Sequence, residues 1–211
     1  MTTLAAVIFW ICAAAMVHTY VTYPLSLKLF RHRFSKPPAF ADGEWPAVAV
    51  LIPAYNEEAV MGNKIRNSLE LEYEAGKLEV LVGSDGSTDR TNEIVKSFDD
   101  PRIRLIELGG RNGKTGVLNH LVKATTAEIL VFTDANVEIE SDALRKLIRH
   151  FADPLVGTAG AGKYIRVPQG ADEVKGEAIY ADIVNRLKKT ESDIGGMSGG
   201  LGSLMAMRRN L

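Results

Sequence analysis

The sequence of 211 residues contains a single cysteine, Cys12, so a framework of internal disulfide bonds is excluded. Its formal net charge is only −1 at pH 7, and this balance gives no sign of nucleic acid or another polyanion as a partner. Internal repeats and tracts of low complexity are also missing. Hydrophobic residues make up 46% of the chain, which is enough for a sizeable core, and the length corresponds to about one or two domains.

Charge is missing from the first 27 residues, which contain no Asp, Glu, Lys or Arg. Within them, Leu4–Val21 is almost wholly apolar and about 18 residues long, which is near the lower limit for a helix that crosses a bilayer. Four basic residues follow directly: Lys28, Arg31, Arg33 and Lys36. By the positive-inside rule, these residues hold the C-terminal side of the helix in the cytoplasm.

We therefore expect a transmembrane anchor over residues 1–27 in the cell membrane, a juxtamembrane linker over 28–46, and a cytoplasmic domain over 47–211. The linker is expected from its prolines and glycine, which interrupt regular structure between 35 and 46. A buried helix of a soluble protein is the alternative interpretation of the apolar segment.

After residue 46, apolar β-branched runs alternate with segments of helical spacing. The pattern predicts strands over 47–52, 78–84, 103–108 and 129–133, an extended segment over 156–167, and helices over 57–71, 88–98, 114–124, 141–151 and 171–187. Strands that alternate with helices predict an α/β fold with a mostly parallel sheet covered on both faces.

Two of the predicted strands end abruptly in acidic motifs. Leu78–Ser84 runs into Asp85-Gly-Ser-Thr-Asp89, and Ile129–Thr133 runs into Asp134-Ala-Asn136. In open α/β sheets, ligands bind in a crevice at the carboxyl ends of the strands. Two such strand ends side by side would direct carboxylates into one pocket, and these suit a divalent cation that carries a phosphorylated nucleotide.

Each motif taken alone also fits a plain turn or a helix cap. Pro53-Ala-Tyr-Asn-Glu57 lacks the glycines of a dinucleotide fingerprint, and Gly109-Gly-Arg-Asn-Gly-Lys-Thr115 lacks the first glycine of a phosphate-binding loop, because residue 108 is Leu. Lys114 is nevertheless predicted at a helix N-terminus, where an anion can bind. Asp89 is predicted to brace the start of its helix, and Asp85 is the better ligand-binding candidate.

Taken together, the ordered motifs resemble the family-2 glycosyltransferases, which are inverting enzymes of GT-A fold. The resemblance covers about Val48 to Leu211. It is carried by Ala54-Tyr-Asn-Glu57, Asp85-Gly-Ser-Thr-Asp-Arg-Thr91, Asn112-Gly-Lys114 with Leu118-Asn119, Phe132-Thr-Asp-Ala-Asn136, and Gly202-Ser203 with Arg208-Arg209.

The resemblance implies that the donor is a nucleoside diphosphate sugar, and it favours a UDP-sugar. By it, Ala54, Tyr55 and Glu57 cradle the base and ribose, Asp85 contacts the base, and Lys114 lies by the nucleotide. Asp134 and Asn136 match the metal motif, which binds Mg²⁺ or Mn²⁺ on the diphosphate. The motif departs from the family at Asn136, because most members have a second Asp there. Gly202 and Ser203 fall on the acceptor side.

The resemblance also places a general base beyond the Arg208-Arg209 segment, and no residue of this chain matches it. We therefore expect the catalytic domain to be incomplete at its C-terminus. The acceptor is expected to be a polysaccharide or a lipid-linked acceptor at the membrane. Two alternatives stay open at this point: a tethered donor-binding module without catalysis, and a sugar nucleotidyltransferase, which would need a basic, glycine-rich loop where Pro53–Glu58 stands.

Overall fold

The computed structural model describes residues 2–34, 45–74, 76–165, 172–196 and 203–211. The chain forms two compact units. One holds the N-terminal helix together with α7 (Asp172–Ile194), and the other holds a six-stranded sheet with its covering helices.

The sheet has the strand order β3-β2-β1-β4-β6-β5. Its strands are β1 (Val48–Ala54), β2 (Leu78–Ser84), β3 (Ile103–Glu107), β4 (Ile129–Thr133), β5 (Thr158–Gly160) and β6 (Leu204–Arg208). The first four are parallel, whereas β6 is antiparallel to both β4 and β5. The connections leave β1 toward β2 and β3 on one side and reach β4 on the other. The order therefore reverses between β1 and β4, which is where ligands bind in sheets of this kind.

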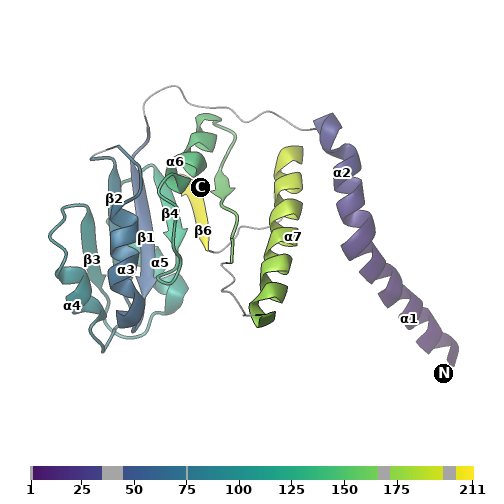
Figure 1. Cartoon of the computed structure of the whole chain (residues 1–211), viewed down its shortest axis with the longest axis horizontal. Coiled ribbons are helices and arrows are strands. Elements are labelled where there is room, and N and C mark those ends of the chain that lie inside the picture. The colour runs from purple at the N-terminus through teal and green to yellow at the C-terminus, as the bar shows by residue number, and fades with distance from the viewer. Residues whose placement is uncertain (1, 35–44, 75, 166–171, 197–202) are drawn as a thin grey trace. The chain divides into compact units, whose positions relative to one another are not determined.

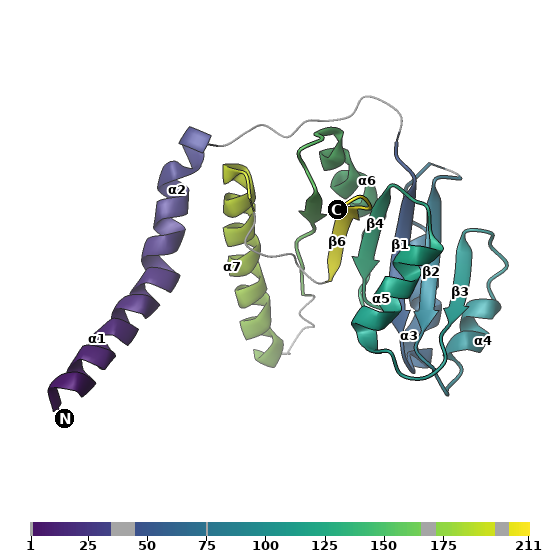
Figure 2. The same ribbon diagram turned by 180° about the vertical axis from the view of Figure 1, so that it is seen from behind.

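Alternate residues of the central strands supply two separate cores, one on each face of the sheet. Val48, Val50 and Ile52 pack with α3 (Glu58–Leu69), α4 (Thr91–Lys96) and α6 (Ala143–Ile148), while Ala49 and Leu51 pack with α5 (Gly113–Ala124). Figures 1 and 2 show α3 on one face and α5 on the other. This arrangement confirms the predicted α/β fold with both faces covered.

Two helix predictions need correction at their N-termini. The helix expected over 88–98 begins only at Thr91. In the turn before it, the N–H groups of Thr88 and Arg90 donate to the side chains of Asn56 and of Glu58, the first residue of α3. The helix expected over 141–151 splits into α6 and a short 3₁₀ turn, η2 (Arg149–Ala152). Asp142 occupies the N-cap position of α6, and the hydroxyl of Ser141 before it donates to Glu72 at 3.1 Å.

The C-terminal part of the sheet differs from the prediction. The extended segment expected over 156–167 contributes only β5, which has three residues, to the sheet, and residues 166–167 lie outside the described part of the chain. β6 was not predicted at all, although it pairs with β4 over five residues. Its sequence, Leu-Met-Ala-Met-Arg, lacks β-branched residues, so intrinsic propensity gives no strand signal there.

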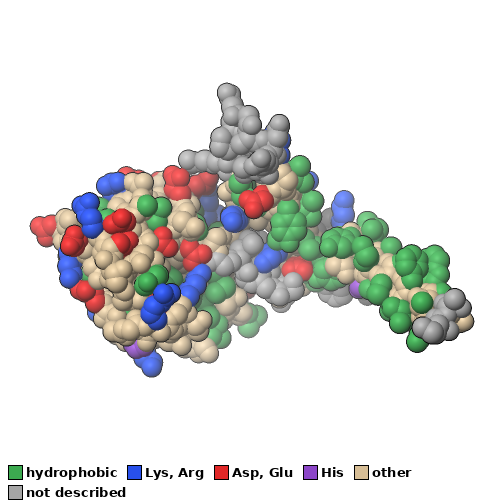
Figure 3. All heavy atoms as spheres, turned by 90° about the horizontal axis from the view of Figure 1, so that it is seen from below, with side chains coloured by type: hydrophobic (Ala, Val, Ile, Leu, Met, Phe, Trp, Pro, Cys, Tyr) green, Lys and Arg blue, Asp and Glu red, His purple; other side chains and the backbone are tan. Residues whose placement is uncertain are grey.

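The N-terminal unit is dominated by one continuous helix. It comprises α1 (Thr2–Val17), a π-helical turn η1 (His18–Thr22) and α2 (Tyr23–Phe34). Its segment Thr3–Phe30, 28 residues long, is long and apolar enough to cross a membrane, and Figure 3 shows hydrophobic side chains along its exposed surface. In the same unit, the Tyr23 hydroxyl donates to Glu191 of α7 at 2.6 Å. Residues 28–34, expected to belong to the linker, continue the N-terminal helix as part of α2, and residues 35–44 lie outside the described part of the chain.

Candidate functional site

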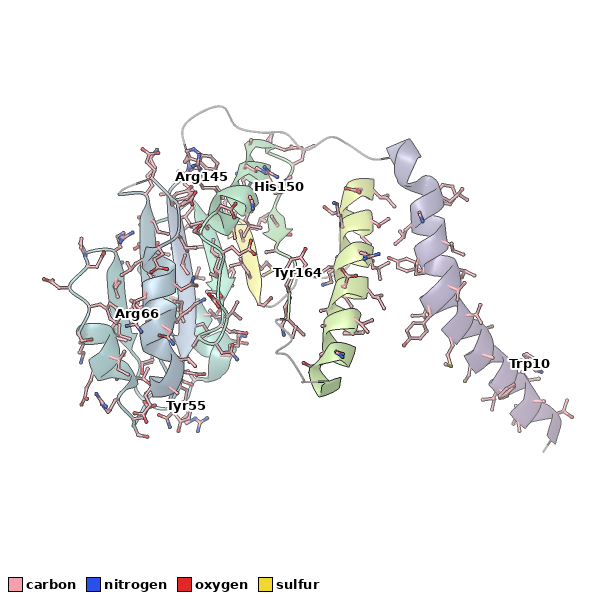
Figure 4. The ribbon with its side chains drawn as sticks, viewed as in Figure 1. Trp10, Tyr55, Arg66, Arg145, His150 and Tyr164 are labelled. Carbon is pink, nitrogen blue, oxygen red and sulfur yellow. The ribbon has the colours of Figure 1, made fainter. Side chains whose placement is uncertain are left out.

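The predicted site lies where β1, β2 and β4 end. Since these strands are parallel and in register, their carboxyl ends meet at one edge of the sheet. Tyr55, which directly follows β1, is at this edge in Figure 4, whereas Arg145 and His150 lie at the opposite one.

The loop after β1 is tied to the loop after β2 by three consecutive backbone N–H groups. Asn56, the one described non-glycine residue with a positive φ (53°), donates to Ser87 Oγ at 3.1 Å. Glu57 N–H donates to Thr91 Oγ1 at 2.8 Å, and Glu58 N–H donates to Asp89 Oδ2 at 3.0 Å. The two loops therefore form one rigid platform at the strand ends.

Asp89 takes part in this platform and not in an open pocket. Its Oδ1 accepts hydrogen bonds from the N–H and the hydroxyl of Thr91, at 3.0 and 2.6 Å. Desolvation acts to raise the pKa of Asp89, but the hydrogen bonds from Thr91 and Glu58 together outweigh it and lower that pKa. The prediction that Asp89 braces the start of its helix is confirmed.

Asp85 holds the loop in front of α5. Its Oδ1 accepts from the backbone N–H of Asn112 at 2.7 Å and from its side-chain amide at 3.0 Å, and Oδ2 accepts from Gly113 N–H at 2.9 Å. These bonds, the backbone one of Asn112 first, lower the pKa of Asp85 despite its desolvation. Asp85 is 5% exposed, and these three bonds leave unused one of the roughly four lone-pair positions of its carboxylate, on Oδ2.

The same loop brings Arg111 over the ring of Tyr55, with the guanidinium carbon 3.9 Å from the ring centroid. The approach of the two loops depends on glycine: a Cβ on Gly86, whose φ is +70°, would lie 2.9 Å from the carbonyl oxygen of Gly110. The flat faces of Tyr55 and Arg111 stand at the strand edge where a planar base can stack.

Lys114 joins this loop to the second acidic motif. It is the second residue of α5, and its Nζ contacts Asp134 Oδ1 at 2.5 Å. Because Asp85 binds the amides of residues 112 and 113, the two predicted carboxylates meet on either side of one short segment. Both side chains of the Lys114–Asp134 pair are partly exposed, so an entering ligand can reach them.

The turn that carries Asp134 is held from below by α3. The Nζ of Lys64, which is 2% exposed, donates to Thr133 Oγ1 at 3.0 Å and to Val137 O at 2.7 Å. Burial lowers the pKa of Lys64 to about 8, and the charge of Asp134 opposes this shift. Asn67, one turn further along α3, binds both the N–H and the carbonyl of Ile139.

A divalent cation fits this donor set only together with a ligand. Within the described part of the chain, no group of three or more His, Cys, Asp or Glu side chains could hold a metal. Asp134 and Asn136 offer one carboxylate and one amide oxygen. Mg²⁺ commonly binds through one or two carboxylates plus substrate phosphates, so these two residues suit a cation that arrives with a diphosphate.

Of the two residues predicted on the acceptor side, Ser203 is the one that lies within the described part of the chain. Leu204 pairs with Thr133, so Ser203 lies at the same edge as Asp134, whereas Gly202 is outside the described residues. Arg208 pairs with Ile129 at the far edge, and its guanidinium binds the carbonyls of three residues: Phe151, Asp153 and Val156. Arg208 therefore anchors the chain after η2.

Two cavities, of about 390 and 210 Å³, lie away from this site. Both are lined by Trp45, directly before β1, and none of the predicted donor-binding residues lines either of them.

Sequence reasoning missed three residues of this region: Lys64, Arg111 and the side chain of Asn112. Arg111 and Asn112 belong to a motif whose lysine alone was assigned a role. Lys64 shares the buried face of α3 with Met61, Ile65 and Ser68, and a lysine at such a position was the available signal.

Comparisons with known proteins agree on one family. Residues 49–211 match the family described as "Glycosyl transferase family 2". Beta-monoglucosyldiacylglycerol synthase of Synechocystis sp. is 30% identical over 169 residues, which cover 74% of this chain and 35% of that protein. Poly-beta-1,6-N-acetyl-D-glucosamine synthase of Staphylococcus aureus is 25% identical over 193 residues, covering 90% and 45%. The chain thus spans about a third to a half of these relatives.

Among solved structures, the mannosyltransferase PcManGT from Pyrobaculum calidifontis, in complex with GDP-Man and Mn²⁺, matches with a TM-score of 0.74 and 30% identity. The match covers 94% of this chain and 55% of that one.

Proposed function

Because the chain belongs to glycosyl transferase family 2, we propose that it binds the donor in a membrane-anchored enzyme that transfers a sugar from a nucleoside diphosphate sugar. The proposed donor is a UDP-sugar, and the sugar passes with inversion to a polysaccharide or a lipid-linked acceptor. The names of the relatives support both acceptor classes, since one makes a glucosyl lipid and another a polysaccharide.

One observation carries this proposal. Asp85 and Asp134, from two different strand ends, both bind the segment Asn112–Lys114. A base that contacts Asp85 and a diphosphate that contacts Lys114 and Asp134 would therefore lie along one short path. The distance between strand ends suits a nucleoside diphosphate, because neighbouring parallel strands lie about 4.8 Å apart and β2, β1 and β4 are adjacent.

We assign the following roles to the chain's own residues. Tyr55 stacks on the base, the free lone pair of Asp85 accepts a base N–H, and Ala54 and Glu57 line the ribose. Lys114 neutralises diphosphate charge at the N-terminus of α5. Asp134 and Asn136 would hold Mg²⁺ or Mn²⁺, which supplies charge stabilisation for the departing diphosphate when bound. The general base that deprotonates the acceptor is not assigned to this chain.

The proposed location is the cell membrane, with the sheet unit in the cytoplasm, where nucleotide sugars are available. The apolar helix Thr3–Phe30 and the basic residues that begin at Lys28 support it. Ser203, at the same sheet edge as Asp134, is the described residue proposed for the acceptor side.

Isothermal titration calorimetry on the full chain in detergent tests the proposal. UDP and GDP are each titrated with and without Mn²⁺, and Mg²⁺ is compared. We expect Mn²⁺-dependent binding of UDP that D85N and D134N each weaken by at least about tenfold, since each removes a charge-assisted contact. D100N is the matched control, because Asp100 pairs with Arg102 away from the site and its loss should leave binding unchanged.

Three outcomes separate the alternatives. Tighter binding of GDP than of UDP would correct the donor, while binding without release of UDP from a UDP-sugar would favour a donor-binding module. Absence of binding to either nucleotide at about 1 mM with metal present would refute the proposal, because even weak specific sites saturate there.

A further inference from the structure

Lys64 is a buried lysine at a position where an apolar side chain would be expected. It lies on the inner face of α3, only 2% of its surface is exposed, and its neighbours on that face are Met61, Ile65 and Ser68. Burying an ammonium group is costly unless it is well paired, and an apolar side chain of similar volume usually serves stability as well or better. A lysine here therefore calls for a role other than core packing.

The two acceptors of Lys64 flank the metal motif on either side. Thr133 directly precedes Asp134-Ala-Asn136, and Val137 directly follows it. The N–H of Val137 donates to the carbonyl of Asp134 at 3.3 Å, which closes the turn between them. One ammonium group thus clamps both ends of the turn.

The clamp determines which side chains of the turn meet solvent. Ala135 is 5% exposed and packs into the core, while Asn136 is exposed and Asp134 is partly exposed. Asn67 extends the attachment by binding the backbone of Ile139 through two bonds of 2.7 and 2.8 Å. Consequently α3 fixes the chain from the end of β4 through Ile139.

We propose that Lys64 is a positioning residue that presets the Asp134–Asn136 turn so that its two oxygen donors face a cation-bound diphosphate. The inference rests on the proposed function of the site and deepens it. Residues that orient metal-binding side chains commonly contribute about 10- to 100-fold to metal affinity. The positive charge of Lys64 also interacts with the carboxylate of Asp134, which Lys114 contacts directly.

The test is the factor by which Mn²⁺ tightens UDP binding to the full chain, measured by calorimetry in detergent. K64M keeps the volume of the side chain but removes the clamp. We expect the dissociation constant of UDP without metal to change less than about twofold, and the tightening by Mn²⁺ to fall about 10- to 100-fold. A residue that merely stabilises the fold would weaken both measurements or neither.

S68A is the matched control, because Ser68 is equally buried on α3 and its hydroxyl donates only to the Lys64 carbonyl. Its Mn²⁺ tightening should equal that of the wild type. An unchanged tightening in folded K64M would overturn the proposal. If K64M does not fold, T133V decides, since it removes one acceptor of the clamp and should reduce the tightening in the same direction; no reduction overturns the proposal.

A nucleotide-independent measurement separates this inference from the proposed function. Amide hydrogen exchange of residues 133–139 in the full chain should become at least about tenfold faster in K64M, while that of β2 stays unchanged, because local opening depends on local contacts. If the wild type binds no nucleotide, the proposed function fails, and this exchange comparison still decides whether Lys64 holds the turn. Equal exchange in wild type and K64M refutes the clamp.

Discussion

The buried ammonium of Lys64 makes the stability of the sheet unit depend on pH in an unusual direction. Burial lowers the pKa of Lys64 from 10.5 to about 8 in the folded chain. Between these two values the unfolded chain keeps a proton that the folded chain has released. The free energy of unfolding therefore rises with pH through this window, because the unfolded state binds more protons. This gain in unfolding free energy is lost again as pH falls through about 8.

The size of the effect follows from the two pKa values. A difference between 10.5 and about 8 corresponds to about 3 kcal/mol of unfolding free energy, gained from below pH 8 to above pH 10.5. Other lysines and tyrosines titrate over the same range, so the wild type must be compared with K64M, which has no proton to release at this position. The Met side chain leaves the Thr133 and Val137 acceptors unpaired, but that cost does not depend on pH.

Urea unfolding of the full chain in detergent, monitored by Trp45 fluorescence, measures this difference. Trp10 lies in the N-terminal helix, so a W10F background removes its signal from both proteins. We expect the stability of the wild type relative to K64M to increase by about 3 kcal/mol between about pH 7 and 10.5. A difference that stays constant within about 0.5 kcal/mol over this range would show that Lys64 is not desolvated, and the reasoning would fail.

Two further predictions concern packing and anchoring. G83A should destabilise the sheet unit by about 1–3 kcal/mol in urea unfolding, because the added Cβ would lie 2.5 Å from Val117 Cγ1. G62A on α3 should instead stabilise it by about 0.5–1 kcal/mol, because its Cβ would meet only Ile94 of α4 and Arg66 at ordinary contact distances. Equal effects of the two substitutions would contradict the packing argument. R208K should lower the free energy of unfolding by about 1–3 kcal/mol, because an ammonium cannot reach the three carbonyls that the guanidinium binds. The affinity for UDP should stay unchanged. Weaker UDP binding at full stability would place Arg208 in the site.

The parts of the fold that the sequence predicted well are those in which one physical signal dominates. β2 and β4 have the bounds expected from their apolar runs, because strands buried on both faces are apolar at nearly every position; Glu79 is the one charged residue of β2. The N-terminus of α5 next to Lys114 was expected from Gly113, whose φ of +70° favours glycine at that junction.

The rest depends on contacts between distant segments, which local patterns do not contain. β6 pairs with the side of β4 that does not pair with β1, and α6 begins later than expected, with Asp142 at its N-cap position and the Ser141 hydroxyl donating to Glu72. The candidate site was predicted as a set of strand ends, but the clamp by Lys64 was not. A lysine can reach two acceptors some seventy residues away only after the sheet has formed, so its partners could not be read from sequence spacing.

The hydrogen bonds between the loop after β1 and the loop after β2 limit how this site could bind phosphate. The three amides of residues 56–58 are already spent on Ser87, Thr91 and Asp89. A glycine-rich phosphate loop would present those same amides to the anion as a fixed cradle. In this chain these three amides are closed to a ligand, so in the proposed site the counter-charge would come from the N-terminus of α5, the Lys114 side chain and an exchangeable ion. The fraction of such a protein with bound donor would depend on the metal and salt concentrations around it. A preformed cradle of backbone amides would make that fraction less dependent on them.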